Sequence, residues 1–153
     1  MKLAHNIKMT VFIKPEEDEQ LLKDRLISLA PFSIEEGSEE NKEKIALKRT
    51  TARGFGQKQI IIYELVLEKE KHTNAFLKFF ASKLDEPQKK MLVRQENRID
   101  DKLDFFIRLD KESLLNNQYN ITDCGECFHI RIALAAFPKK KEIAKAVVEM
   151  IFS

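Results

Sequence analysis

The feature that most constrains the fold is an alternation in segment 7–13, in which every second residue is a buried-type aliphatic side chain. A period of two predicts a β-strand with one face turned to a core and the other to solvent. The same alternation recurs in segment 128–136. The apolar faces of the two segments are Ile7, Met9, Val11 and Ile13, and Phe128, Ile130, Ile132 and Leu134.

Two hairpins are expected in addition to the first strand. One pairs 45–53 with 58–70 around the turn Gly54-Phe55-Gly56, and the other pairs 119–122 with 128–136 around a tight turn. Segment 58–70 has apolar residues at both odd and even positions, which indicates a central strand with much of both faces covered. A further strand is expected at 105–109.

Helices are expected between the strands. Pro15, followed by acidic residues, opens a helix that Pro31 stops. Thr73 or Asn74 is expected to cap the next helix.

Two more helices complete the pattern. Asp85 and Gln88 fit a capping box that starts a helix reaching about Asp104. A short helical turn is expected at 110–117, and a closing helix at 138–152. We therefore predict a single α+β domain over residues 1–153, an antiparallel-rich mixed sheet with helices packed on it.

Composition limits the function classes without selecting one. The formal net charge of the 153 residues is only +2, so any basic binding surface has to be local. No apolar run approaches the roughly 20 residues that span a bilayer, and the first residues lack the apolar region of a signal peptide. We expect a soluble cytoplasmic protein without membrane contact.

Three consecutive lysines, Lys139, Lys140 and Lys141, stand where the last strand gives way to the closing helix. Ammonium groups beside the free N–H groups of a helix N-terminus suit a phosphate. Lys145 is assigned to the same contact. The alternative is a solvated basic turn.

Phe55 is placed at the tip of the first hairpin, between Arg53 and Lys58. An aromatic ring between cations suits stacking on an unpaired base with phosphate contacts nearby. Arg53-Gly54-Phe55-Gly56 also matches the first half of an RNA-recognition-motif pattern, although the second half departs from it. The alternative is a simple hairpin connector, with Phe55 folded back on the protein.

Cys124 and Cys127 have metal-ligand spacing, and His129 lies two residues on. A structural zinc ion takes four ligands, and the chain has no further cysteine. Free thiols, a disulfide and metal ligation all stay open. Because no catalytic or nucleotide-binding motif is present, we expect no cofactor and no enzyme. A metal-dependent RNA enzyme built on Asp123, Glu126 and His129 is a less favoured alternative.

Several stretches spread along the chain resemble an archaeal RNA-binding family described as predicted exosome subunits. They are His5-Asn6-Ile7, Lys71 to Leu77, Arg98 to Asp101, Phe105 to Arg108, and Thr122 to Ile130. The resemblance implies an α+β fold related to ribosomal protein L5, RNA binding, and a part in RNA processing with exosome proteins among the partners.

The closing helix departs from the K-K-x-A-K pattern of double-stranded-RNA-binding domains. Ala144 and Lys145 come one residue late after Lys140 and Lys141, which turns them by about 100° around the helix. We therefore do not expect duplex RNA to be recognised in the manner of those domains.

The sequence thus predicts a non-enzymatic RNA-binding protein, an accessory factor in RNA processing, degradation or ribosome biogenesis. Its predicted contacts are Lys139, Lys140, Lys141 and Lys145, with Arg53, Phe55 and Lys58 as a second set. The alternative is a protein-interaction subunit or homodimer that touches RNA only through its partners, which the acidic first third of the chain favours.

Changing Lys139, Lys140 and Lys141 together to Ala should weaken RNA binding and flatten its salt dependence. Each lost phosphate contact on a single strand lowers the slope of log K against log salt by about 0.7. RNA titration at two salt concentrations measures both quantities. An unchanged affinity and slope would remove these lysines from the binding surface.

Overall fold

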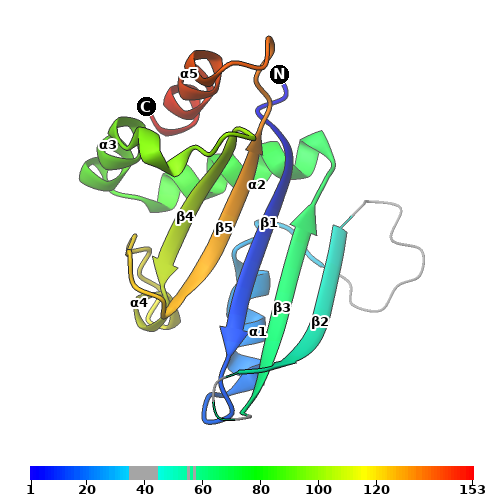
Figure 1. Cartoon of the computed structure of the whole chain (residues 1–153). Helices are drawn as coiled ribbons and strands as arrows, with labels where there is room; N and C mark the ends of the chain where they lie inside the picture. Colours follow the sequence, from blue (N-terminus) through cyan, green and yellow to red (C-terminus); the bar gives the residue numbers. More distant parts are fainter. Residues whose placement is uncertain (35–44, 55, 57) are drawn as a thin grey trace.

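The computed structural model describes residues 1–34, 45–54, 56 and 58–153. Its five-stranded sheet has the order β2-β3-β1-β5-β4, and every pairing is antiparallel (Figure 1). The strands are β1 (Ala4–Ile13), β2 (Ile45–Arg53), β3 (Gln59–Leu67), β4 (Asp104–Asp110) and β5 (Cys127–Leu134). The predicted single-domain α+β class is confirmed, and the parallel pair that a mixed sheet requires is absent from the described strands.

The central strand is β1, which pairs with β3 on one side and β5 on the other. Its apolar parity is almost completely buried, and the neighbouring strands place apolar residues opposite it. Ile7, for example, lies between Leu67 of β3 and Ile132 of β5. The alternation in the sequence therefore builds one continuous apolar sheet face.

Helices cover that apolar face and leave the other one open (Figure 1). They are α1 (Glu19–Ser28), α2 (Glu70–Lys83), α3 (Glu86–Arg94), the short α4 (Lys111–Leu115) and α5 (Lys141–Phe152). Phe76 and Phe80 of α2 are buried and stack with their centroids 5.6 Å apart. The ring of Phe152 in α5 lies 6.1 Å from that of Phe105 in β4 and so joins this helix to the sheet. No described helix is long and apolar enough to cross a membrane.

Helices α1 and α2 begin at other residues than expected. α1 begins at Glu19 and not at Pro15, because the Asp18 carboxylate accepts the backbone N–H of Leu21 and caps the helix there. α2 begins at Glu70, one turn before the predicted cap at Thr73 or Asn74, so both residues lie inside the helix. Thr73 is fully buried inside the helix, with its hydroxyl on the carbonyl of Glu70, so it cannot serve as a cap.

The Asp85 cap of α3 is confirmed, since its carboxylate accepts the N–H of Gln88. Gln88 does not complete the capping box. Its side-chain amide instead donates to the carbonyl of Tyr119 and accepts the N–H of Ile121. α3 ends at Arg94 and a 3₁₀ turn follows at Glu96–Arg98, so the single long helix predicted to Asp104 is wrong.

The second predicted hairpin is also wrong. Ile121 bridges to Leu109 of β4 and does not pair with β5. Both edges of β5 are already occupied, by β1 and β4, so segment 119–122 runs along the outer edge of β4 instead. The hydrogen bonds of Asp110 N–H to Asn120 and of Thr122 N–H to Arg108 hold it there.

The closing helix starts at Lys141, three residues after the predicted Pro138. Lys140 is its extended N-cap, and its side chain makes no capping hydrogen bond. Ala144, Val147, Val148 and Phe152 of this helix are buried.

Lys111 is a buried cation that joins three segments at the lower end of the sheet. Its side chain is only 8% exposed, and Nζ donates to the carbonyl of Phe12 at 2.9 Å and to Glu17 at 3.1 Å. Glu126 lies 3.5 Å away. Lys111 thus holds the end of β1, the turn before α1 and the turn before β5 together.

Lys111→Ala should lower the free energy of unfolding by about 3 kcal/mol, because it removes a buried cation that donates to the Phe12 carbonyl and to the Glu17 carboxylate. Urea denaturation measures the change. Lys90→Ala, which alters an exposed lysine of α3, should stay within about 0.5 kcal/mol of the parent protein. A Lys111→Ala protein as stable as the Lys90→Ala control would contradict the proposed structural role of Lys111.

Candidate functional site

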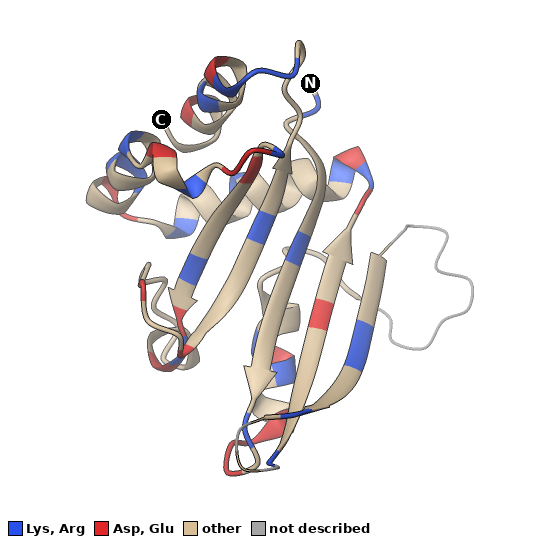
Figure 2. Cartoon of the chain, viewed as in Figure 1, with Lys and Arg blue, Asp and Glu red and all other residues tan. Residues whose placement is uncertain are grey.

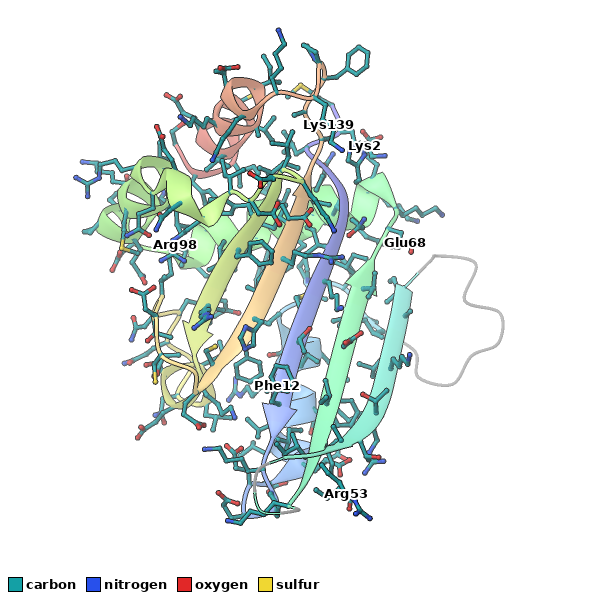
Figure 3. All side chains as sticks on the ribbon, in the orientation of Figure 1. Lys2, Phe12, Arg53, Glu68, Arg98 and Lys139 are labelled. Carbon is teal, nitrogen blue, oxygen red and sulfur yellow. The ribbon has the colours of Figure 1, made fainter. Side chains whose placement is uncertain are left out.

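The face of the sheet that no described helix covers carries a regular array of polar and aromatic side chains (Figures 1 and 3). The strand register places them in two rows that cross all five strands. One row is Lys48, Glu64, Thr10, His129 and Arg108. The next row is Ala46, Val66, Lys8, Arg131 and Phe106. We call this surface the open face.

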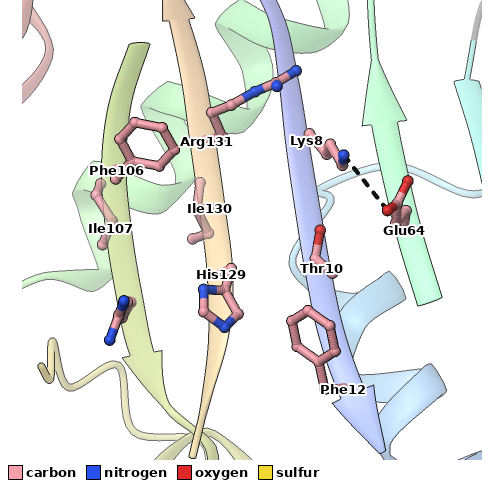
Figure 4. A pocket seen from close by; sticks show the side chains of 10 residues that line it. Lys8, Thr10, Phe12, Glu64, Phe106, Ile107, His129, Ile130 and Arg131 are labelled. Carbon is pink, nitrogen blue, oxygen red and sulfur yellow. Dashed lines mark ion pairs between the residues drawn. The ribbon is translucent and has the colours of Figure 1, made fainter. Parts of the chain in front are cut away.

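A shallow hollow of about 410 Å³ lies in the middle of the open face. Figure 4 shows its side chains, with Phe106 of β4 at one end and Phe12 of β1 at the other. Each of these two phenylalanines is 43% exposed, which is unusual for a ring on a sheet whose opposite face is buried. Both rings are therefore available to stack against a planar group.

Three cations surround the two rings: Lys8, Arg108 and Arg131. Figure 2 shows basic positions on β1, β2, β4 and β5 and an acidic position on β3. That acid is Glu64, which lies 3.5 Å from the Lys8 ammonium group. Arg131 has one long hydrogen bond, 3.5 Å to Asn6, and its Nε atom is buried without a partner among the described residues, so its terminal nitrogens are the ones that a ligand can meet. The open face can thus hold anionic groups next to stacked rings.

His129 lies at the centre of the array, half-buried between the two rings. The edge of its ring meets Phe12 with the centroids 5.4 Å apart, and Nε2 lies 3.5 Å from the Cys127 sulfur. Burial lowers the pKa of His129, and the nearby Arg108 and Lys111 lower it further. The ring is therefore neutral at pH 7 and can stack or exchange hydrogen bonds without adding charge.

Both cysteines are free thiols, with Cys124 exposed and Cys127 buried. Burial raises the pKa of Cys127, which keeps that thiol protonated. Among the described residues, no group of three or more His, Cys, Asp and Glu side chains is arranged to hold a metal ion. Asp123, Glu126 and His129 do not come together as such a cluster.

The predicted lysines lie beyond the upper end of the sheet, where Lys139 is labelled in Figure 3. Lys139, Lys140 and Lys141 are exposed. Lys145 instead forms an ion pair with Glu96 at 2.7 Å, and this bond lowers the pKa of Glu96. Lys145 is thus already partly neutralised by the protein itself.

The second predicted set lies at the opposite end of the sheet. Arg53 ends β2 and is exposed, as is Lys58, and the N–H of Gly54 closes the turn on the carbonyl of Lys58. Phe55 lies outside the described residues. The structure therefore does not bring the two predicted sets together, and the open face lies between them.

Sequence reasoning missed the residues of the open face itself. They are Lys8, Phe12, Phe106, Arg108 and Arg131. One signal was present: Phe12 falls on the polar parity of the alternating segment 7–13, where the pattern leaves a large ring in solvent. The grouping of Phe12 with Phe106 depends on the strand order β1-β5-β4.

The chain matches a family of known proteins, and solved structures share its fold. The model of a family described as "RNA binding" matches residues 6–134. The chain is 28% identical to "RNA-binding protein PAB1135" of Pyrococcus abyssi over 150 residues, which are 97% of this chain and 94% of that protein.

Solved structures share the fold along the whole chain. Mth689 of Methanothermobacter thermautotrophicus, described as a DUF54 protein, has a TM-score of 0.77 at 22% identity and covers 99% of each chain. SSO0741 of Sulfolobus solfataricus has a TM-score of 0.69 at 20% identity and covers 95% of this chain and 98% of its own. The expected kinship with ribosomal protein L5 stays a prediction.

Acidification should destabilise the protein through His129. Because the folded pKa of His129 lies below its unfolded value, the neutral ring's contribution is complete above the unfolded value of about 6.5 and is lost as the pH falls through the folded pKa. Urea denaturation at pH 7 and pH 5 should show a larger loss for the parent than for His129→Phe. Equal losses in the two proteins would mean that His129 carries no such linkage.

Proposed function

The chain belongs to the RNA-binding family, and we propose that it binds single-stranded RNA across the open face of its sheet. The observation that carries this proposal is the pair of half-exposed rings, Phe12 and Phe106, set among Lys8, Arg108 and Arg131. Unstacked bases pack on aromatic rings while cations contact the phosphates.

The shape of the surface favours single strands over duplex RNA. In a duplex the base faces are stacked inside and cannot reach rings on a flat sheet. The hollow between Phe12 and Phe106 is wide and shallow, so a base that is already unpaired can lie in it. Neutral His129 and the acceptor Glu64 are among the residues that line it, and both can exchange hydrogen bonds with the polar edge of a base.

In this proposal the cations of the open face contact the phosphates of the RNA, and its rings contact the bases. Arg131 has only one long hydrogen bond within the described protein, and Arg108 is exposed. These guanidinium groups are available to the RNA backbone. A handful of such contacts gives binding that is roughly micromolar and strongly dependent on salt.

The lysines predicted from the sequence extend this surface in the proposal. RNA that runs along β1 and β5 would meet Lys139, Lys140 and Lys141 beyond the upper end of the sheet. At the lower end it would meet Arg53 and Lys58, with Phe55 as a further stacking group. Of these residues, Lys145 is expected to contribute least to RNA binding, because its ammonium group is paired with Glu96.

We further propose a binding role without catalysis, as an accessory factor in RNA processing, degradation or ribosome biogenesis. Exosome subunits or a second copy of this chain are partners within the same proposal. The membership of the chain in an RNA-binding family supports the RNA part of it.

Phe12→Ala and Phe106→Ala should each weaken binding of a single-stranded RNA about tenfold, because each removes a stacking contact of about 1–3 kcal/mol. The slope of affinity against salt should stay unchanged, since no phosphate contact is lost. Arg131→Gln should instead lower that slope by about 0.7. Fluorescence anisotropy with labelled RNA at two salt concentrations measures both effects.

Leu21→Ala is the matched control, because Leu21 is a large side chain, 44% exposed, on α1 at the covered face. It should bind RNA like the parent protein. Thermal melting of each variant separates loss of binding from loss of fold. Full affinity in a folded Phe12→Ala, Phe106→Ala double variant would show that RNA does not lie on the open face.

A further inference from the structure

A second hollow, of about 350 Å³, adjoins the open face at the outer edge of β4. Phe106 and Arg108 belong to both hollows and stand between them. The remaining lining of this second hollow, which we call the edge pocket, is Gln95, Asn97, Arg98 and Asp123. A strand of RNA that stacks a base on Phe106 would therefore place that base or the next one beside the edge pocket.

Arginine side chains position the backbone and side chain of Asp123 at the mouth of the edge pocket. Arg108 donates to the backbone carbonyl of Asp123 at 3.1 Å, and an Arg98 nitrogen lies 3.5 Å from one carboxylate oxygen. The Asp123 side chain is nevertheless 93% exposed, whereas that of Arg98 is only 11% exposed. The backbone of Asp123 is thus held by Arg108, while its carboxylate lies near Arg98 and is open to a ligand.

The side chain of Arg98 is itself fixed by two hydrogen bonds to the protein. It donates to the carbonyl of Phe106 at 3.3 Å and to the side-chain oxygen of Gln95. These bonds anchor the guanidinium group against β4 and the residue before the 3₁₀ turn. Arg98 is labelled in Figure 3. The pocket therefore offers a rigid cation and a solvent-facing carboxylate side by side, next to an aromatic ring.

We propose that the edge pocket selects a guanine base in the single-stranded RNA. The Watson–Crick edge of guanine presents two adjacent donors, N1–H and N2–H₂, followed by the acceptor O6. The Asp123 carboxylate accepts the two donors together, and a guanidinium group of the pocket, Arg98 or Arg108, donates to O6. Phe106 supplies the stacking face.

The other bases match this pocket less well. Uracil offers the carboxylate one donor between two acceptors, and adenine and cytosine each place an acceptor next to their amino group. An unpaired acceptor facing a carboxylate costs a hydrogen bond and adds repulsion. The Watson–Crick edge is also free only when the base is unpaired, which agrees with single-stranded RNA as the ligand.

This inference rests on the proposed function and is tested with four nonamers. The first is all uridine, and the other three carry guanosine, inosine or 7-deazaguanosine at the centre. The protein should bind the guanosine nonamer roughly tenfold more tightly than the inosine and all-uridine nonamers, because inosine lacks the 2-amino group. The 7-deazaguanosine nonamer keeps the whole Watson–Crick edge and should bind like guanosine.

Asp123→Asn should abolish the preference for guanosine over inosine, since the amide offers one acceptor and a donor in place of two acceptors. Asp101→Asn is the matched control, an exposed aspartate in the turn before β4, and should keep the preference. Melting temperatures confirm that both variants are folded. Fluorescence anisotropy at one fixed salt concentration gives all the affinities.

The outcomes separate the two proposals. Binding of all four nonamers with equal affinity, or a preference that survives Asp123→Asn, would overturn the edge pocket alone. Loss of the preference with 7-deazaguanosine would also overturn it, because arginine would then be contacting O6 and N7. A protein that binds none of the nonamers would overturn the proposed function and the edge pocket together.

Discussion

The pairing of β1 with both β3 and β5 is the interaction on which the rest of the structure depends. A strand paired on both sides satisfies its backbone groups within the sheet, so its side chains are free to define two different surfaces. Ile7, Met9, Val11 and Ile13 turn one surface into the core under α1 and α2. Lys8, Thr10 and Phe12 turn the other into the open face. One alternating segment thus fixes both the stability of the domain and its candidate binding surface.

Exposing two phenylalanines on a flat sheet carries a cost, because apolar patches on a soluble protein favour self-association. The neighbours of the rings reduce that cost. Lys8, Arg108 and Arg131 place charges around Phe12 and Phe106. The same cations that keep the surface hydrated are the ones that can contact a phosphate backbone. Solubility and ligand binding therefore both favour positively charged side chains at these positions.

The sequence predicted most of the helices and strands because the signals for single elements are local. Alternation located β1 and β5, the capping carboxylate of Asp85 located the start of α3, and the apolar run at 58–70 located β3. The failures have a common cause. The side chain of Gln88 is hydrogen-bonded to Ile121, which lies 33 positions further along the chain. Neither segment contains a local signal that identifies the other as its partner. Thr73 looks like a cap by residue type, yet burial against the sheet extends α2 past it.

For the candidate site, the sequence by itself determined which residues share a strand face, since a period of two needs no knowledge of the fold. It also determined an RNA-binding expectation, through a resemblance along the chain. Only the tertiary structure decided which faces meet. The order β3-β1-β5-β4 brings Phe12 and Phe106 to one hollow although 93 residues separate them, and it places Arg98 and Asp123 beside Phe106. It also left the conspicuous lysines at 139–141 beyond the end of the sheet. Strand order is set by which apolar faces pack together most completely, and that is a property of the whole chain and not of any segment.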